Sequence, residues 1–214
     1  MEILLSLVIL IFSIIAHEVA HGYAANSLGD PTARLAKRLT LNPIAHIDLM
    51  GSIIIPALLI FSHSPMLFGW AKPVPYNPYN LTNKRFGEAF VAVAGSATNI
   101  LLAVIFGLIV RFGSTTGFFD STMLSVAALI TFINLFLGLF NLIPFPPLDG
   151  FTVLRSALPW HLSSKMESFE HQIRNAGIVS LILFLVVFSS ILSGPFFNFV
   201  LFIFKTLTGS PLGL

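Results

Sequence analysis

The sequence places two histidines and a glutamate close together, in the segment His17-Glu18-Val19-Ala20-His21. On a helix, residues four apart lie on the same face, so both imidazoles can bind one Zn²⁺. Glu18 lies one step round the helix and can reach a water molecule bound to that ion. The spacing therefore predicts a zinc site in which His17 and His21 are ligands and Glu18 is a general base.

Hydrolysis of a peptide bond is the reaction typical of this H-E-x-x-H arrangement. Zn²⁺ lowers the pKa of its bound water to about 7 and polarises the carbonyl group, while the glutamate takes a proton and passes it to the leaving amine. The motif lies in the second half of an apolar run over residues 3–25. Because polar groups at membrane depth are expensive, three of them in one apolar helix indicate a function.

Two histidines leave such a site one protein ligand short. Among the nine acidic residues, Asp149 is the best candidate, because it follows an apolar run at a break rich in proline. At such a break, irregular backbone can turn a carboxylate inward. His46 and Asp48 stay open as alternatives, although a buried polar residue in a loop ordinarily only forms hydrogen bonds.

The composition shows in what kind of protein these residues must be positioned. Of the 214 residues, 56% are hydrophobic and 9% are charged, and the mean hydropathy is +0.91. A soluble domain carries about 25% charged residues, so a soluble enzyme is excluded. The absence of cysteine excludes disulfides, cysteine zinc sites and thiol catalysis. There is no basic block that would indicate a nucleic-acid partner, and the expected surroundings are a lipid bilayer.

Apolar runs predict an all-α polytopic membrane protein with about five to six transmembrane helices, forming a single domain over residues 1–214. The part that carries the catalytic residues is expected within residues 3–150, and the C-terminal helices within residues 151–214. An amphipathic interfacial helix is expected over residues 151–175. The apolar runs cover residues 3–25, 86–110, 121–142, 177–192 and, as a half-span, 195–204.

Two shorter segments lie between the first and second long runs. Residues 51–61 are apolar but too few to span a bilayer, and they contain Pro56, which favours a re-entrant segment that returns by residue 68. Residues 69–83 contain three prolines, which exclude a helix interior. We expect this second segment to be an extended strip at the membrane interface with short strands.

The distribution of Lys and Arg predicts how the chain is oriented in the cell membrane. Residues 26–50 and 69–85 together hold six Lys and Arg residues, and residues 151–175 hold three more. The positive-inside rule places all of them on the cytoplasmic side if the short apolar segment dips into the membrane and returns. The first and third long runs then point in the same direction, so the H-E-x-x-H motif and Asp149 are expected toward the cytoplasmic side.

Three separated motifs, in this order, resemble those of the site-2 protease family of intramembrane zinc metalloproteases. They are His17-Glu18-x-x-His21, Gly95-Ser-Ala-Thr-Asn99 and Asn141-x-x-Pro144-x-Pro146-x-Leu148-Asp149-Gly150. The chain also resembles the small bacterial and archaeal branch of that family, through Asn42-Pro43, Asp48 and Gly51 and through Gly69-Trp-Ala-Lys-Pro-Val-Pro75. The resemblance covers about residues 11–150.

The resemblance implies a three-helix catalytic core with one zinc ion per chain. His17, His21 and Asp149 are implied as the zinc ligands and Glu18 as the general base. The implied partner is a membrane protein that is cleaved in or near a transmembrane segment. No PDZ or CBS domain is expected.

Three further motif residues are candidate substrate contacts. Gly95 and Asn99 lie one turn apart on the 86–110 helix, where close packing of helices through small residues is the alternative role. Asn141 can bind an extended substrate backbone, stabilise the oxyanion, or satisfy a carbonyl that Pro144 frees.

Two other functions use similar residues. A zinc or divalent-cation transporter also carries paired histidines in a membrane helix, but it needs ligands along a path. Residues 89–110, 122–142 and 177–204 contain no Asp, Glu or His, which counts against transport. A catalytically dead scaffold would keep the fold, but the intact Glu18 argues against it.

Overall fold

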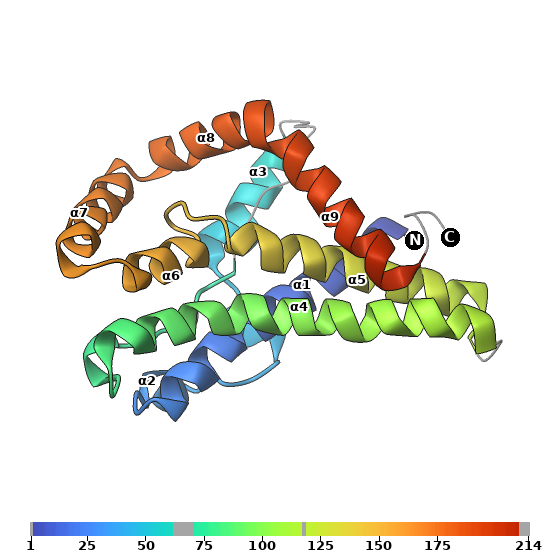
Figure 1. The fold of residues 1–214 in the computed structure, drawn as a ribbon, viewed down its shortest axis with the longest axis horizontal. Coiled ribbons are helices and arrows are strands. Elements are labelled where there is room, and N and C mark those ends of the chain that lie inside the picture. Colours follow the sequence, from blue (N-terminus) through green and yellow to red (C-terminus); the bar gives the residue numbers. More distant parts are fainter. Residues whose placement is uncertain (1, 62–70, 117–118, 210–214) are drawn as a thin grey trace.

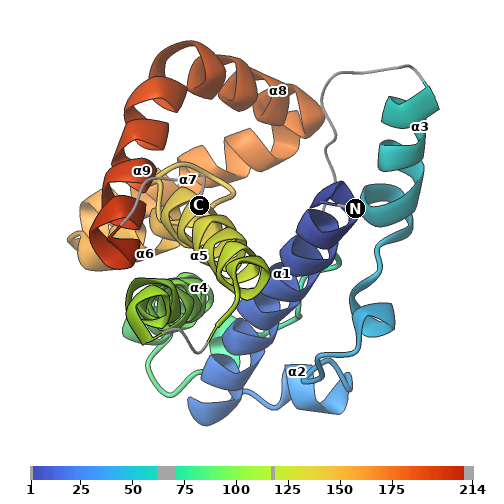
Figure 2. The ribbon, with the colours of Figure 1, turned by 90° about the vertical axis from the view of Figure 1, so that its right-hand side faces the viewer.

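Three long helices form the centre of the computed structural model, which describes residues 2–61, 71–116 and 119–209. They are α1 (Glu2–Ser27), α4 (Lys84–Thr116) and α5 (Ser121–Asn141). Figure 2 looks nearly along α4 and α5 and shows α1 crossing beside them. These helices correspond to the first three long apolar runs of the sequence.

Shorter elements connect and surround this centre. Before α4 they are α2 (Thr32–Leu35), η1 (Pro43–His46), η2 (Leu49–Ile54), α3 (Ile55–Phe61) and η3 (Pro78–Asn80). After α5 they are α6 (Asp149–Ala157), α7 (Trp160–Ala176), α8 (Ile178–Val187), η4 (Phe188–Leu192) and α9 (Ser193–Thr208). The expected interfacial helix over 151–175 is divided into α6 and α7, because Pro159 cannot continue α6.

Four of the described helical stretches are long and apolar enough to cross a membrane, which is fewer than the five to six expected. They are Ile3–Ser27, Lys84–Gly113, Ser121–Asn141 and Ile182–Thr208. The difference arises at the C-terminal end, where the two apolar runs form one stretch. The helix continues through the π-helical η4 into α9, so Pro195, at the start of α9, does not end the stretch.

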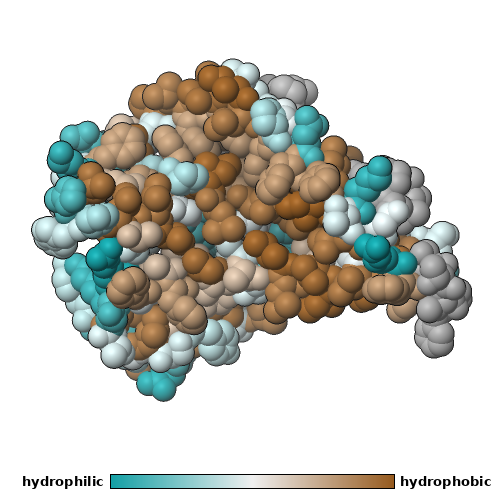
Figure 3. Space-filling view, viewed as in Figure 1, coloured by the Kyte–Doolittle hydropathy of each residue, from teal (hydrophilic) through white to brown (hydrophobic). Residues whose placement is uncertain are grey.

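The middle of the molecular surface is hydrophobic, as a lipid-facing surface requires. Figure 3 shows brown side chains across the middle of one face. Hydrophilic side chains gather mainly at the end where α2, α7 and the start of α4 lie (Figures 1 and 3). This end holds the charged segments that the sequence assigns to the cytoplasmic side.

Close contact between α4 and α5 depends on a glycine. A Cβ atom on Gly138 would lie 2.9 Å from Ile100 Cγ1 and 3.1 Å from the Ser96 carbonyl oxygen. Small residues allow membrane helices to approach in this way. The close approach brings buried polar side chains of α4 and α5 within reach of α1.

The strip over residues 71–77 is extended, as expected, but the described residues contain no strand. Its prolines lack the N–H groups that a ladder needs. Single hydrogen bonds hold it instead. Lys72 N donates to the His46 carbonyl oxygen at 2.9 Å, and Arg38 Nη2 donates to the Lys72 carbonyl oxygen at 2.6 Å.

A buried carboxylate fixes the far end of the strip. Asp30 accepts hydrogen bonds from the backbone N–H of Asn77 at 2.7 Å and from Asn80 Nδ2 at 2.8 Å. Burial raises the pKa of the Asp30 carboxyl, but hydrogen bonds from Thr32, Asn80 and Asn77 outweigh burial and hold the pKa below its ordinary value. Asp30 therefore ties the loop after α1 to the strip.

The predicted re-entrant segment is described only in its first half. Leu49–Ile54 and Ile55–Phe61 are helical, and Asp48 caps the first of them by accepting from Gly51 N at 2.7 Å. The predicted return, over residues 62–68, lies outside the described residues. The re-entrant path therefore stays a prediction.

Candidate metal centre

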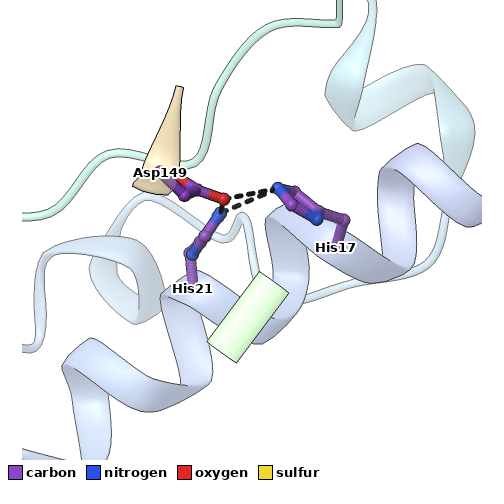
Figure 4. Close-up of side chains that lie close together, drawn as sticks. All are labelled: His17, His21 and Asp149. Carbon is purple, nitrogen blue, oxygen red and sulfur yellow. Dashed lines mark hydrogen bonds and ion pairs between the residues drawn. The ribbon is translucent and has the colours of Figure 1, made fainter. Parts of the chain in front are cut away.

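Three predicted ligands, His17, His21 and Asp149, come together in the structure (Figure 4). His17 Nε2 lies 3.1 Å and His21 Nε2 lies 3.4 Å from Asp149 Oδ2. The two Nε2 atoms lie 3.0 Å apart. The histidines come from successive turns of α1, and the carboxylate comes from the first residue of α6, more than a hundred residues later.

Both imidazoles are fixed in orientation by hydrogen bonds that their Nδ1 atoms form. His21 Nδ1 donates to the Val91 carbonyl oxygen at 2.7 Å, and His17 Nδ1 donates to Asn99 Oδ1 at 2.7 Å. A neutral imidazole has one N–H, so a proton on Nδ1 leaves a lone pair on Nε2. Both lone pairs then point toward the Asp149 carboxylate.

These donor atoms fit a zinc ion. With the protons on Nδ1, two imidazole lone pairs and a carboxylate oxygen converge on one point, and a cation at that point makes this arrangement favourable. Zn–N and Zn–O bonds of about 2.0–2.1 Å in a tetrahedron place ligand atoms about 3.3 Å apart. The separations of 3.0, 3.1 and 3.4 Å match that value. His17, His21 and Asp149 would therefore hold the metal.

The Asp149 carboxylate is positioned by the turn that precedes it. A Cβ atom on Gly150 would lie 2.1 Å from the Leu142 carbonyl oxygen, so only glycine allows the loop 142–148 to fold back onto the start of α6. Asp149 thereby supplies the carboxylate oxygen among the three candidate ligand atoms.

A glycine on α4 makes room for the histidines. A Cβ atom on Gly95 would lie 2.5 Å from His21 Nε2 and 2.8 Å from His17 Cε1. Gly95 therefore lies directly against the predicted metal ligands. Its predicted role in substrate binding is not needed to explain why glycine stands there.

Glu18 has a partner that the sequence did not indicate. Its Oε2 accepts a hydrogen bond from the backbone N–H of Val74 at 2.9 Å. Val74 is buried in the extended strip that Asp30 and Arg38 hold in place. No sequence signal identifies this contact, because the donor is a main-chain group.

The other predicted site residues lie in different environments. Asn99 is fully buried behind His17, and Asn141 Nδ2 bonds back to the Leu137 carbonyl oxygen at 3.0 Å. His46 Nε2 donates to the Thr40 carbonyl oxygen at 2.8 Å, and Asp48 caps η2. Within the described residues, neither His46 nor Asp48 belongs to the cluster of possible metal ligands.

Two polar residues of the core were missed by the sequence reasoning. Ser13 and Asn134 are buried and join Asn99 behind His17. Their signal was present in the sequence, because both are polar residues inside apolar runs of membrane-spanning length.

Comparisons with known proteins indicate a family of zinc metalloproteases. Residues 114–187 match the model of Peptidase family M50. The chain is 36% identical over 194 residues to "Putative zinc metalloprotease YwhC" of Bacillus subtilis, covering 88% of this chain and 84% of that protein. It is 30% identical over 151 residues to the Rip2 protein of Mycolicibacterium smegmatis, covering 69% of this chain and 55% of that one, under the same description. No solved structure matches the chain.

Proposed function

The chain belongs to peptidase family M50, the site-2 protease family, and is a zinc metalloprotease of a multi-pass membrane type; from this premise we propose that it hydrolyses a peptide bond in or near a transmembrane segment of another membrane protein. One observation carries the proposal. The three candidate ligand atoms converge between helices whose outer surfaces are apolar, and His17 is only 6% exposed. A site within such helices is suited to a substrate that comes from the bilayer.

The residues divide the work as follows. His17, His21 and Asp149 hold the metal, which when bound acidifies a water molecule and polarises a carbonyl group. Glu18 accepts a proton from the attacking water and returns it to the leaving amine. The Val74 N–H holds Glu18 Oε2, so the carboxylate keeps one orientation while its other oxygen carries the proton.

The substrate segment must unwind before it is cut. In a helix each carbonyl oxygen accepts a hydrogen bond from four residues further on, which hides it from attack. Unwinding in lipid is unfavourable unless other groups satisfy the freed backbone. The extended strip over residues 71–77, which contacts Glu18 through Val74, offers a main-chain edge beside the site.

The site is proposed to open toward the cytoplasm. His17 and His21 lie in the second half of α1, which continues into the loop that Asp30 anchors. The segments at this end carry the Lys and Arg residues that the positive-inside rule assigns to the cytoplasmic side. Water reaches the site from that side.

A transport function is less well supported. The described residues form one cluster of possible metal ligands, whereas a transport path needs several along its length. Glu88, the acidic residue buried in α4, forms an ion pair with Arg155. The described part of the chain contains no second cluster of residues that could bind a cation along such a path.

Replacement of Glu18 by glutamine tests the proposal. The Glu18→Gln variant keeps all three ligands, so we expect stoichiometric zinc but loss of cleavage. Comparative proteomics of membrane fractions from cells with wild-type or variant protein should show a membrane protein that accumulates uncut. Glu167→Gln, on α7, is the control and should behave as wild type. Identical membrane proteomes with wild-type and Glu18→Gln protein would contradict the proposal.

A further inference from the structure

A network of buried amide groups lies directly behind His17 and joins all three core helices. Asn99 of α4, Asn134 of α5 and Ser13 of α1 are 0%, 1% and 5% exposed. Asn99 Nδ2 donates to Asn134 Oδ1 at 2.8 Å, and Asn134 Nδ2 donates to Ser13 Oγ at 2.9 Å. Of these three residues, only Asn99 forms a hydrogen bond with the His17 imidazole in the described structure, so the other two act on the proton at Nδ1 through Asn99.

The orientation of the Asn99 amide is fixed by a main-chain carbonyl group. Asn99 Nδ2 lies 3.2 Å from the Ser13 carbonyl oxygen, which can accept a hydrogen bond but cannot donate one. The NH₂ group of Asn99 must therefore face Ser13 and Asn134. Its oxygen is left to face His17 Nδ1 at 2.7 Å.

The orientation of the Asn134 amide is fixed in the same way. Asn134 Nδ2 lies 2.9 Å from the Ile130 carbonyl oxygen, which again can only accept. Asn134 Oδ1 must then face Asn99 and accept from its NH₂ group. Two carbonyl groups, on α1 and α5, therefore determine the direction of every hydrogen bond in the network.

We infer that Asn134 and Ser13 are positioning residues that hold the Asn99 amide in the one orientation that places the proton of His17 on Nδ1. A reversed Asn99 amide would present NH₂ to His17 Nδ1, and the proton would move to Nε2, which then could not bind a metal. This inference rests on the proposed ligand set. It assigns a function to Asn134 of α5 and Ser13 of α1, neither of which belongs to the proposed ligand set.

His21 supports this reasoning by contrast. Its Nδ1 donates to the Val91 carbonyl oxygen, a group that cannot be reversed. A main-chain acceptor fixes the tautomer without further help. His17 has a side-chain acceptor, and a side-chain amide needs partners of its own to stay in one orientation.

The tautomer of His17 can be measured in the metal-free protein. Purified protein with ¹⁵N-labelled histidine, in detergent at a pH well above the ordinary pKa of histidine, gives separate NMR signals for the two tautomers, and His17→Gln identifies the signal. We expect protonated Nδ1 in the wild type. A wild-type signal from a neutral imidazole with its proton on Nε2 and none on Nδ1 would overturn the inference, whatever the behaviour of any variant.

Two variants then test the network itself. Asn99→Leu removes the acceptor, and Asn134→Leu removes the group that orients it. In both we expect a mixed tautomer signal and weaker zinc binding in a chelator competition. Loss of an outer partner of a ligating histidine lowers metal affinity about 10–100-fold, and we expect this for Asn99→Leu and a smaller loss for Asn134→Leu.

One control separates positioning from mere stability. Thr131→Val removes a buried hydroxyl one turn before Asn134 that bonds only to the Ala127 carbonyl oxygen, and it should change neither tautomer nor affinity. Wild-type tautomer and affinity in both leucine variants would refute this inference alone. Failure of the wild type to bind zinc would instead refute the proposed ligand set.

Discussion

The three core helices pack together in part through polar side chains, whereas the C-terminal helices α8 and α9 pack through apolar ones. Where α1, α4 and α5 meet, buried side chains are often polar; they are Ser13, His17, Ser96, Asn99, Thr131 and Asn134. In α8, η4 and α9 the buried side chains are apolar except Thr208, whose hydroxyl bonds back to its own helix. Polar groups must meet with fixed geometry, whereas apolar groups need only fill space.

The C-terminal region packs mainly through phenylalanine. Its aromatic cluster joins α5 and the loop 142–148 to α8, η4 and α9, with ring centroids 4.5–6.3 Å apart. The cluster contains Phe136, Phe140, Phe145, Phe184, Phe188, Phe196 and Phe197. Phe145 stacks on Phe184 and connects this cluster to the loop that ends at Asp149. The comparison predicts that substitutions where α1, α4 and α5 meet lower zinc affinity, whereas substitutions in the phenylalanine cluster lower the free energy of unfolding.

The largest effect on zinc is expected from Asp149→Ala. It removes one of three ligands, so zinc content measured by mass spectrometry should fall well below one ion per chain, and cleavage should be lost. Asp120→Ala is the control, because Asp120 caps α5 and its loss lowers the free energy of unfolding by about 1 kcal/mol without touching the site. Stoichiometric zinc in Asp149→Ala would contradict the assignment of Asp149 as the third ligand.

Gly95→Ala should weaken zinc binding while leaving the fold intact. The added Cβ atom falls 2.5 Å from His21 Nε2, so the imidazole must move. Alanine favours a helix by about 1 kcal/mol over glycine, so thermal stability should not fall through the backbone. We expect about a 10–100-fold loss of zinc affinity in a chelator competition, the size seen when support of a ligand is lost.

The control for this change is another helical glycine. A Cβ atom on Gly194 meets nothing within 4 Å, so Gly194→Ala should bind zinc as the wild type does. Equal affinities of Gly95→Ala and wild type would show that the histidines have more room than the structure gives them.

Phe184→Ala tests the other region. Phe184 is 5% exposed and contacts Phe140, Phe145 and Phe188, so its truncation should lower the free energy of unfolding by about 3–5 kcal/mol. Thermal unfolding in detergent measures this, and Phe202→Ala, on the exposed side of α9, is the control. Zinc affinity should change little. A loss of zinc as large as in Gly95→Ala would show that the two regions are not separate.

The smallest effect is expected on stability at low pH, through Asp30 in the loop after α1. Because the pKa of Asp30 is lower in the folded protein than in the unfolded chain, its stabilisation is complete above about pH 4, the ordinary value, and is lost as the pH falls through the lower folded value. Thermal unfolding at several pH values should show this loss. Asp30→Asn should make the unfolding temperature depend less on pH in this range, and an unchanged pH dependence would contradict the role given to Asp30.

The sequence was sufficient to predict that His17, His21 and Asp149 come together, because helical spacing has a direct geometric meaning. His17 and His21 had to share a face, and Asp149 followed a proline-rich break that let it turn inward. The role of Gly95 was not predictable, because it depends on how close α4 lies to α1. The contact of Val74 with Glu18 involves a main-chain donor, which no residue type reveals. The two C-terminal apolar runs were predicted as separate elements, whereas they form one helical stretch of membrane-spanning length in the described structure, because the helix continues through η4.

The central claim is that one zinc ion is held by two imidazoles and one carboxylate. X-ray absorption at the zinc edge of the purified protein tests it most directly, because imidazole gives a distinct scattering pattern. We predict two imidazole ligands with nitrogen and oxygen at about 2.0–2.1 Å, and one imidazole after His17→Gln. A third imidazole in the wild type, or an unchanged spectrum after His17→Gln, would contradict the account.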